Sequence, residues 1–487
     1  MTARRHKLWI NGQWAQSEHG KLAEIHSPYS GEGVAQADQA SPAQVEQALA
    51  AAHEAFGKFR KISRYGRSRL LALMAQEIGA RRAEFVELIV SEAGKPYGLA
   101  DGEVGRAINT FTIASEEAKR MGGEVIPIDI EPAGRAYAPA TTFWVPGGPI
   151  LAIAPFNFPL NLIAHKVAPA LAVGASIVVK PPPQAPGAAT LLAEVFEKAA
   201  REASDSRDQI PLAALQVISG SNEVIGPTVT DPRMTFLSFT GSDKVGWVLR
   251  EKAYRKKVAL ELGGNAAVIV HSDADIQRAA ARCAFGGFAY AGQICISVQR
   301  IIVQQSVAAK FQELLLAEVS KLVVGNPAQK DTVVGPLIDS KAADRVMSWI
   351  DEARQDGAKV LVGGTRNGSV IAPTILTGVK PHHKLNTEEV FGPVVVLNTY
   401  DGIDEAVASV NRSRFGLQAG VFTDSSKVIR KVIEELEVGG VMINEVPTYR
   451  ADNMPYGGVK DSGVGREGIR YAMEEYCERR TVVAWQG

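Results

Sequence analysis

The chain has 487 residues, of which 46% are hydrophobic and 22% charged, and its 53 basic and 53 acidic residues give a formal net charge of zero. This length is enough for roughly two large or three average domains with a sizeable core. The charge balance gives no support to a nucleic-acid-binding or membrane-surface role, because both need clustered basic residues. The 3 cysteines argue against a disulfide framework and fit a reducing compartment.

The sequence predicts a soluble, cytoplasmic protein without a metal site. No cysteine and histidine cluster has the spacing of metal ligands, and the basic N-terminus leads into no apolar stretch of signal-peptide length. The segment 136–164 contains no charged residue, but prolines and glycines interrupt it. A lipid-exposed helix could not satisfy its backbone there, so we expect a strand, a turn, a second strand and a loop.

The first half of the chain predicts an α/β unit. Apolar residues three or four apart predict helices over 42–58, 67–93 and 99–121. Short apolar strands then alternate with helices. The expected strands are 150–154, 176–180, 215–218 and 235–239, and the expected helices are 161–171, 187–202 and segments after Gly220 and Ser242. This alternation predicts an open, mostly parallel sheet with helices on both faces.

A second α/β pattern begins near Glu261. Two such domains with a cleft between them are the simplest account of the chain. The strand candidates are 266–270, 298–303, 359–362, 394–399 and 441–443, and the helices are 275–289, 308–319 and 340–355.

Cys295 stands in the run Gly292-Gln-Ile-Cys-Ile-Ser297, between a glycine-rich helix end and a β-rich segment. A lone cysteine in an apolar neighbourhood is usually a small core residue. Small residues beside the thiol leave room for a substrate, so Cys295 is also a candidate nucleophile.

Two polar residues stand out within apolar segments. Glu261 lies in an apolar strand that ends in two glycines. A buried carboxylate without a partner has the raised pKa that a general base needs, whereas the alternative is a salt-bridged or outward-facing residue. Asn157 lies between two phenylalanines and two prolines, in a stiff loop that suits an oxyanion donor. It could equally cap the following helix.

Two turns, 219–226 and 239–246, could hold a dinucleotide. Each follows a predicted strand and opens a helix, so free N–H groups and the positive helix end could face a phosphate. Neither matches G-x-G-x-x-G well, and each signal is weak by itself. Lys180 ends a predicted strand and is either a ribose or phosphate ligand or a solvated turn lysine.

Together these residues give the chain a strong resemblance to the aldehyde dehydrogenase superfamily. Seven motifs occur in that family's order between residues 155 and 463. They are Pro-Phe-Asn-Phe-Pro, Val-Val-Lys-Pro, Phe-Thr-Gly-Ser, Leu-Glu-Leu-Gly-Gly, Gly-Gln-Ile-Cys, Glu388-Glu-Val-Phe-Gly-Pro393 and Pro455-Tyr-Gly-Gly-Val-Lys-Asp-Ser-Gly463.

The resemblance implies that Cys295 is the nucleophile and Glu261 the general base. Asn157 and the backbone N–H of Cys295 would form the oxyanion hole, and Lys166 matches a family lysine near the site. The thiolate would attack the aldehyde, hydride would leave for the nicotinamide, and water activated by Glu261 would release the acid.

The resemblance also implies an NAD or NADP site. Lys180 and Glu389 would hold ribose hydroxyls, Ser242 the pyrophosphate and Phe391 the nicotinamide. Further cofactor contacts are expected at Ala154, Pro155, Phe156, Pro182, Ser219, Gly220, Phe239, Thr240, Gly241, Leu262 and Gly263.

One departure from the family pattern favours NADP, or the use of both cofactors. Many NAD-preferring relatives carry a glutamate three residues after the ribose lysine, where this chain has Pro183. Such a carboxylate would repel a 2′-phosphate, so its absence removes a barrier to NADP.

The substrate expected from the resemblance is a short hydroxylated or anionic aldehyde. Arg106 matches a phosphate-binding arginine of the non-phosphorylating glyceraldehyde-3-phosphate dehydrogenases, and Arg450 lies within one residue of another anion-binding arginine. Ile294 and Phe158 replace an arginine and a tyrosine of those enzymes, and Ile296 also neighbours the cysteine. The motifs around Cys295 also look like the lactaldehyde dehydrogenase branch. The alternative for both arginines is an ordinary surface ion pair.

The fold that the resemblance implies is a Rossmann-like cofactor domain, an α/β catalytic domain and a small β arm for oligomerisation. The cofactor domain would take 1–125 and 148–259 and the catalytic domain 260–445. The arm would take 126–147 and 470–487, and 446–469 would return to the cleft. Strands at 137–145 and 479–485 would pair across a subunit boundary of a homodimer or homotetramer.

Two other functions stay open at this point. A CoA-acylating semialdehyde dehydrogenase would use the same cysteine but pass the acyl group to CoA, and the presence of Glu261 favours hydrolysis instead. A non-catalytic structural or regulatory protein on this scaffold would have no need of the complete set of Cys295, Glu261 and Asn157.

Overall fold

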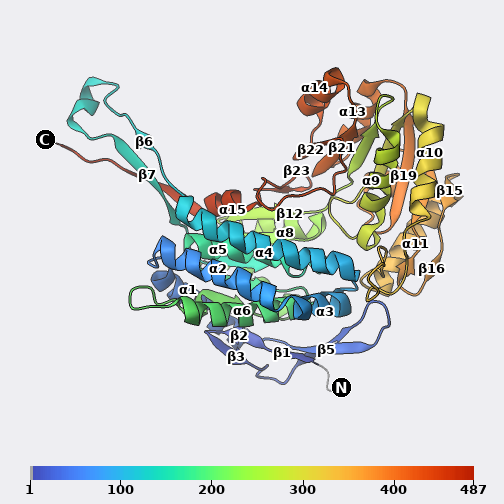
Figure 1. Ribbon diagram of the computed structural model, residues 1–487. Coiled ribbons are helices and arrows are strands. Elements are labelled where there is room, and N and C mark those ends of the chain that lie inside the picture. Colours follow the sequence, from blue (N-terminus) through green and yellow to red (C-terminus); the bar gives the residue numbers. More distant parts are fainter. Residues whose placement is uncertain (1–3, 487) are drawn as a thin grey trace.

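The computed structural model describes residues 4–486, and two large sheets with a projecting arm organise it (Figure 1). The larger sheet has eight strands in the order β24-β12-β11-β8-β9-β10-β2-β3. Its five strands from β12 to β10 run parallel, and the outer strands pair antiparallel. The strands are β24 (Gly463–Val464), β12 (Lys257–Glu261), β11 (Phe236–Thr240), β8 (Ile150–Ile153), β9 (Ile177–Lys180), β10 (Leu215–Val217), β2 (Leu8–Ile10) and β3 (Gln13–Ala15).

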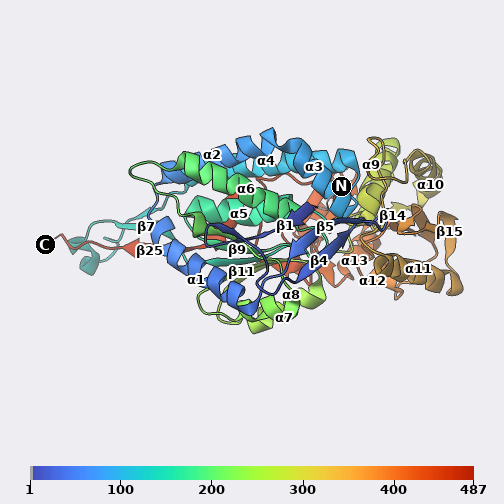
Figure 2. The ribbon, with the colours of Figure 1, turned by 90° about the horizontal axis from the view of Figure 1, so that it is seen from below.

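Helices cover both faces of this sheet, as the alternating pattern predicts (Figure 2). Successive residues of a strand point to opposite faces, so Ile150 of β8 packs in one core and Leu151 in the other. The first core lies under α2 (Arg64–Ala80), α3 (Arg82–Ala93), α4 (Tyr97–Arg120), α5 (Asn161–Val173) and α6 (Gly187–Ala203). The second lies under α1 (Pro42–Phe59), α7 (Asn222–Ile225) and α8 (Asp243–Lys252).

The second large sheet has seven strands in the order β15-β18-β19-β14-β13-β21-β22. All neighbouring strands are parallel except the pair β15 and β18. The strands are β15 (Lys359–Val362), β18 (Thr374–Thr377), β19 (Val394–Tyr400), β14 (Arg300–Gln304), β13 (Ala267–Val270), β21 (Gln418–Phe422) and β22 (Gly440–Ile443). One face packs on α9 (Ile276–Phe288), α10 (Gln305–Val319) and α11 (Ser340–Gln355), the other on α13 (Ile403–Asn411) and α14 (Ser426–Glu435).

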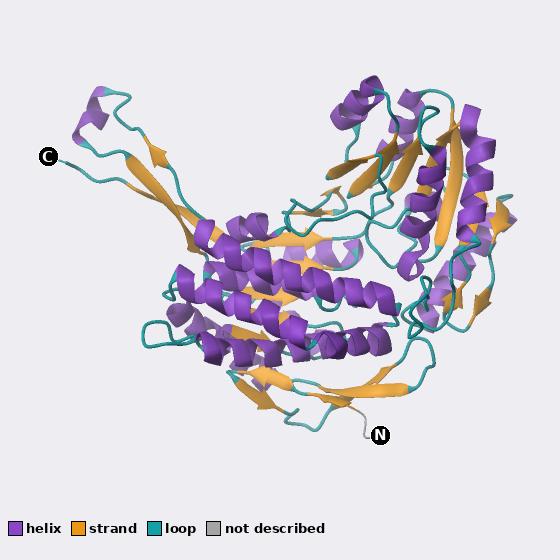
Figure 3. Ribbon diagram, in the orientation of Figure 1, coloured by secondary structure: helices purple, strands orange, loops and turns teal. Residues whose placement is uncertain are grey.

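The arm is a three-stranded antiparallel ribbon that projects from the body (Figure 3). Its central strand β7 (Ala140–Pro146) lies between β25 (Cys477–Val482) and the short β6 (Val125–Ile126). The two segments predicted to form the arm therefore pair with each other within one chain, and a bridge from Tyr137 to Trp485 extends the pairing.

Smaller elements complete the described part of the chain. A three-stranded sheet near the N-terminus consists of β1 (Arg4–His6), β5 (Gly33–Asp38) and β4 (Leu22–His26). The remaining elements are β16 (Arg366–Asn367), β17 (Val370–Ile371), α12 (Lys384–Thr387), β20 (Phe415–Gly416), β23 (Val459–Lys460) and α15 (Ile469–Glu475), together with four short 3₁₀ turns. Within residues 4–486 no helix is both long and apolar enough to cross a membrane.

One expectation about the elements was wrong. The predicted helix over 67–93 is two helices, because the backbone at Arg81 leaves helical geometry (φ −102°, ψ 21°) and α3 begins at the next residue. The second α/β pattern begins shortly after Glu261, with β13 in the place of the predicted strand 266–270. Since β12 pairs in parallel with β11, Glu261 ends a strand of the first sheet, and the second sheet begins at β13.

Candidate active site

A cavity of about 580 Å³ opens at the carboxyl ends of β8, β11 and β12, where ligands bind in open parallel sheets. Segments of the second sheet close its other side. The cavity brings together twelve of the residues singled out in the sequence: Pro155, Phe156, Asn157, Thr240, Gly241, Ser242, Glu261, Leu262, Gly263, Cys295, Glu389 and Phe391.

Cys295 follows a sharp change of chain direction after α9. Tyr290 and Ala291 both have a left-handed backbone (φ 53°), and Gly292 follows with φ 70°. A side chain at Gly292 would lie 2.2 Å from the carbonyl oxygen of Gly392, so this tight turn requires glycine.

The Cys295 thiol is partly buried, and its Sγ lies 2.9 Å from the hydroxyl oxygen of Tyr456. Burial raises the pKa of this thiol to about 12, although the hydrogen bond with Tyr456 acts in the opposite direction. With a pKa this high the thiol is protonated at neutral pH, and its reaction requires a base or a change of surroundings.

Glu261 is 4% exposed, and neither carboxyl oxygen has a hydrogen-bond partner in residues 4–486. Burial, and then the charge of Glu467, raise the pKa of Glu261 well above its ordinary value. In the described part of the fold, Glu261 is therefore neither salt-bridged nor outward-facing.

Asn157 does not cap the following helix, because the N-terminus of α5 has no side-chain cap from the loop. Its Nδ2 instead donates to the carbonyl oxygen of Gln293 at 2.9 Å, two residues before Cys295, and its buried Oδ1 has no partner within residues 4–486. The amide is thereby oriented beside the cysteine segment.

Glu103 of α4 caps α5 in place of Asn157. Its Oε1 accepts hydrogen bonds from the backbone N–H groups of Leu160 and Asn161, at 2.9 and 3.0 Å. Its other oxygen accepts from Lys95, a buried cation that lies 3.4 Å from the ring centroid of Phe158. A buried ion pair thus fixes the loop that carries Asn157.

Lys166 lies in a buried charge network beside the cavity. Its Nζ donates to Ser238, to Thr240 at 2.7 Å and to Glu467 at 3.1 Å. Arg450 donates to the other oxygen of Glu467 at 3.1 Å. Burial opposes ionisation of Glu467, but the two cations outweigh it and hold its pKa at about 2.

The two arginines expected at the substrate are both ion-paired. Arg106, with 30% of its side chain exposed, pairs with Asp452, which also accepts a hydrogen bond from His165. The Arg450 side chain is only 6% exposed and stacks on the ring of Tyr456, so it is not a surface ion pair. Ile294 and Ile296 pack around Cys295 with Leu417 and Tyr456.

Candidate cofactor groups line the outer part of the cavity. Glu389 accepts the backbone N–H of Gly264 at 3.0 Å, and burial raises its pKa to about 7. A side chain at Gly263 would lie 2.3 Å from Glu389, so only glycine leaves that carboxylate in place. Phe391 has a left-handed backbone (φ 46°), and its ring meets that of Phe156 edge-on at 6.0 Å.

Several candidates lie outside the lining of this cavity. Lys180 is buried at the end of β9, where burial lowers its pKa, so it is not a solvated turn lysine. The turn at Ser219 and Gly220 opens α7, a helix of only four residues. The candidates outside the lining are Ala154, Lys166, Lys180, Pro182, Ser219, Gly220, Phe239, Arg106, Phe158, Ile294, Ile296 and Arg450.

Sequence reasoning missed some groups at the site. Arg345, Trp349 and Lys384 line the cavity from α11 and α12, and the Arg345 guanidinium lies 4.9 Å from the ring centroid of Trp349. His165 and Asp452 were also missed, because only the fold brings α5 against a segment 287 residues later. Arg345 lies in the predicted helix 340–355, but nothing in the sequence showed that this helix borders the cavity.

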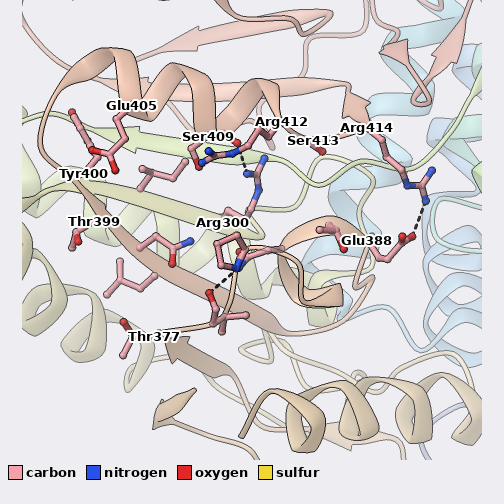
Figure 4. Close-up of a pocket in the computed structure, with 18 residues that line it drawn as sticks. Arg300, Thr377, Glu388, Thr399, Tyr400, Glu405, Ser409, Arg412, Ser413 and Arg414 are labelled. Carbon is pink, nitrogen blue, oxygen red and sulfur yellow. Dashed lines mark hydrogen bonds and ion pairs between the residues drawn. The ribbon is translucent and has the colours of Figure 1, made fainter. Parts of the chain in front are cut away.

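A second cavity of about 640 Å³ lies between α13 and the strands β14, β18 and β19 (Figure 4). It shares Glu388 and Arg414, an ion pair of 2.7 Å, with the lining of the first. Its buried Arg300 donates to the carbonyl oxygens of Asn265 and Ser409. These hydrogen bonds hold Arg300 of β14 against its neighbouring segments, and nothing in this cavity indicates a ligand.

Comparison with known proteins gives one consistent answer. The model of the aldehyde dehydrogenase family matches residues 14–482. The 3-sulfolactaldehyde dehydrogenase of Priestia megaterium is 42% identical over 99% of this chain and 98% of its own length. A lactaldehyde dehydrogenase of Methanococcus aeolicus is 37% identical over 98% and 99% of the two chains.

Solved structures agree with the sequence comparisons. Aldehyde dehydrogenase 21 from Physcomitrella patens, in complex with the product succinate, superposes with a TM-score of 0.95 at 36% identity, covering 100% of this chain and 99% of its own. Glyceraldehyde-3-phosphate dehydrogenase from Methanocaldococcus jannaschii, complexed with NADP, gives 0.90 at 37% identity over 95% and 98%. Family, fold and the resemblance of the motifs coincide, and this chain belongs to the aldehyde dehydrogenase family.

Proposed function

We propose that this enzyme oxidises a short hydroxylated or anionic aldehyde to its carboxylic acid with NAD(P) as the hydride acceptor. The observation that carries the proposal is one cavity lined by the Cys295 thiol, the unpartnered carboxylate of Glu261 and the held amide of Asn157. Together they supply a nucleophile, a base and an oxyanion donor.

The chemistry assigned to these side chains begins at the thiol. Cys295 Sγ bonds to the aldehyde carbon as its proton is transferred to a base, and the Asn157 amide donates to the oxygen that becomes negative. The bound nicotinamide supplies the hydride acceptor for this oxidation. The acyl group is then a thioester on Cys295. Glu261 takes a proton from water, the water oxygen bonds to the acyl carbon, and the carboxylic acid leaves as the Cys295 thiol forms again.

The residues present fit a dinucleotide. Gly263 leaves the space in which Glu389 stands, and Ser242 precedes the N-terminus of α8 without capping it. We assign ribose hydroxyls to Glu389 and Lys180, the pyrophosphate to Ser242 and the nicotinamide face to Phe391. Arg345 and Lys384 add positive charge to the same cavity, and with Pro183 they favour NADP or the use of both cofactors.

The substrate class rests on the charges beside Cys295. The guanidinium groups of Arg106 and Arg450 both lie in this cluster and can donate to an anionic or hydroxyl oxygen, so a short monoanionic or hydroxylated aldehyde is favoured. The names of the relatives, a sulfolactaldehyde and a lactaldehyde dehydrogenase, describe substrates of this kind.

We also propose the division of labour within the fold. The eight-stranded sheet would form most of the cofactor domain and the seven-stranded sheet the catalytic domain. The edge strands β25 and β22 each have one neighbour among residues 4–486, so the arm of one chain could extend the sheet of a second copy. A homodimer or homotetramer would follow.

A panel of short aldehydes tests the proposal. Lactaldehyde, glyceraldehyde, glyceraldehyde 3-phosphate and succinate semialdehyde are each supplied with NAD or NADP, and the products are identified. We expect NAD(P)H together with the free acid in equal amounts. Formation of an acyl-CoA in the presence of CoA, with no free acid, would replace hydrolysis by CoA acylation. No aldehyde-dependent NAD(P)H formation across the panel would contradict the proposal.

A further inference from the structure

We propose that His165 is a specificity-determining residue whose ring Nδ1 accepts a hydrogen bond from a hydroxyl group of the aldehyde. The inference rests on the proposed function and adds to it a residue that recognises a hydroxyl group of the substrate. Arg106 and Arg450, in contrast, can only donate and therefore suit an anionic group.

A short series of side chains connects His165 with the reactive thiol of Cys295. It stands three residues after Leu162 on α5, a spacing that places the two on neighbouring parts of one helix face. Leu162 lines the cavity with Cys295, whereas His165, like Arg106 and Arg450, lies outside that lining. Its hydrogen-bond partner Asp452 stands two residues after Arg450 in the chain. Arg450 lies 3.8 Å from the ring centroid of Tyr456, whose hydroxyl is 2.9 Å from the Cys295 Sγ.

The partner of Nε2 fixes which ring nitrogen carries the proton. His165 Nε2 lies 3.0 Å from Asp452 Oδ1, and that oxygen also accepts two hydrogen bonds from Arg106. Burial disfavours the charge on Asp452, but His165 and Arg106 outweigh it and hold its pKa well below the ordinary range. An ionised carboxylate only accepts, so Nε2 is the nitrogen that donates.

The second nitrogen is then an acceptor without a donor. Burial and the charge of Arg450 lower the pKa of His165 to about 4, so the ring is neutral at pH 7 and Nδ1 carries a lone pair. The side chain is fully buried, and Nδ1 has no hydrogen-bond partner within residues 4–486. Such an acceptor is costly to leave unpaired.

The acceptor character of Nδ1 selects a substrate group that can donate a hydrogen bond. A carboxylate, sulfonate or phosphate oxygen offers Nδ1 a second lone pair and is repelled, whereas a hydroxyl group donates to it. The two kinds of side chain therefore bind different groups of the substrate. The guanidinium groups bind an anionic group, and His165 binds a hydroxyl group on the carbon chain.

Matched aldehydes test this assignment. Propanal, lactaldehyde, 3-hydroxypropanal and 2-fluoropropanal differ only in the position and donor capacity of one substituent. We measure kcat/KM for each with the wild type, His165→Leu, His165→Phe and His165→Gln. In the Leu and Phe variants we expect the ratio of a hydroxyaldehyde to propanal to fall about tenfold, because one hydrogen bond is lost.

The controls separate recognition from structure. The ratio of 2-fluoropropanal to propanal is expected to stay constant, since fluorine cannot donate. His165→Gln, whose amide oxygen can accept, is expected to recover part of the preference. Cofactor affinity and the midpoint of thermal unfolding report whether each variant is folded, and the Phe variant serves if the Leu variant is not.

The results have distinct meanings. An equal loss with every aldehyde would show a merely structural role, and an unchanged ratio would show that water satisfies Nδ1; either would overturn the inference. A wild-type enzyme that oxidises none of the four aldehydes, nor any in the panel above, would instead overturn the proposed function.

Discussion

Two carboxylates, the buried Glu261 and the half-buried Glu389, face the same cavity, and their surroundings suit them to different tasks. Glu261 has no hydrogen-bond donor, whereas Glu389 accepts one from the Gly264 backbone. Burial raises both pKa values, that of Glu389 to about 7. A carboxylate without donors is the stronger base, and one with a backbone donor is the better fixed acceptor for hydroxyl groups.

The affinity for NADP should therefore depend on the ionisation of Glu389. Its pKa of about 7 lies above the ordinary 4.5, so the proton leaves as the pH rises through about 7. The ionised form accepts two hydroxyl groups, and we expect the Kd for NADP to fall across this range. Because folding raises the pKa of Glu389, the free energy of unfolding should also fall as the pH rises from 4.5 to about 7.

Calorimetric titration with NADP at several pH values measures this effect. Glu389→Gln should bind more weakly and lose the pH dependence. Glu388→Gln serves as the neighbouring control, because that carboxylate pairs with Arg414 instead, and it should keep the dependence. An unchanged pH profile in Glu389→Gln would refute the assignment.

Sequence reasoning worked best for residues whose role is local. The setting of Cys295, Glu261 and Asn157 within their motifs could be read directly, and the fold gathers all three in one cavity. The surroundings of His165 and Arg450 could not be read, because their partners lie far away in the chain. The tautomer of a histidine depends on a carboxylate that only tertiary packing brings to it.

At the scale of elements, the loop before α5 depends on an ion pair inside the fold. The side chains of Lys95 and Glu103 are only 1% and 0% exposed. Burial lowers the pKa of Lys95 to about 8. Removing Glu103 leaves the charge of Lys95 buried without a partner and the N-terminus of α5 without its cap.

Glu103→Gln should destabilise the protein by about 3 kcal/mol, because Lys95 loses its carboxylate. It should also lower kcat, since the loop that carries Asn157 is held less firmly. The control is Asp101→Asn on the same helix, which removes an exposed ion pair with Arg82 and should cost less than about 1 kcal/mol. Chemical denaturation compares the two, and equal losses would contradict this role of Glu103.

Helices and buried strands were predictable where their pattern was long and regular, and α11 matches its expected bounds. The break between α2 and α3 was not, because both helices continue the same apolar periodicity. The hairpin of β2 and β3 was missed although Asn11 and Gly12, both with positive φ, mark a tight turn. Short strands such as β21 have no alternation, because both of their faces are buried.

At the scale of the molecule, the arm exposes apolar side chains that a lone chain leaves in water. Ile130 and Trp485 are 87% and 71% exposed, and Val483 is 51% exposed. With the free edge of β25, this surface is suited to another copy.

Replacing Val483 and Trp485 by lysine should lower the mass in solution, because charge and lost apolar area weaken a contact between arms. Light scattering after gel filtration gives the mass, expected at two or four times that of the chain in the wild type. Tyr29→Lys, a similar change in the turn between β4 and β5, should leave the mass unaltered. A wild-type monomer would rule out the assembly proposed here.

The central claim is that the acyl group forms on Cys295, and one measurement tests it most directly. Aldehyde-dependent NAD(P)H formation is followed in Cys295→Ala, with Cys283→Ala as the control because Cys283 is buried in the core away from the cavity. We predict that Cys295→Ala still binds NADP but forms no NAD(P)H, while Cys283→Ala remains active. Undiminished NAD(P)H formation in Cys295→Ala would contradict the account.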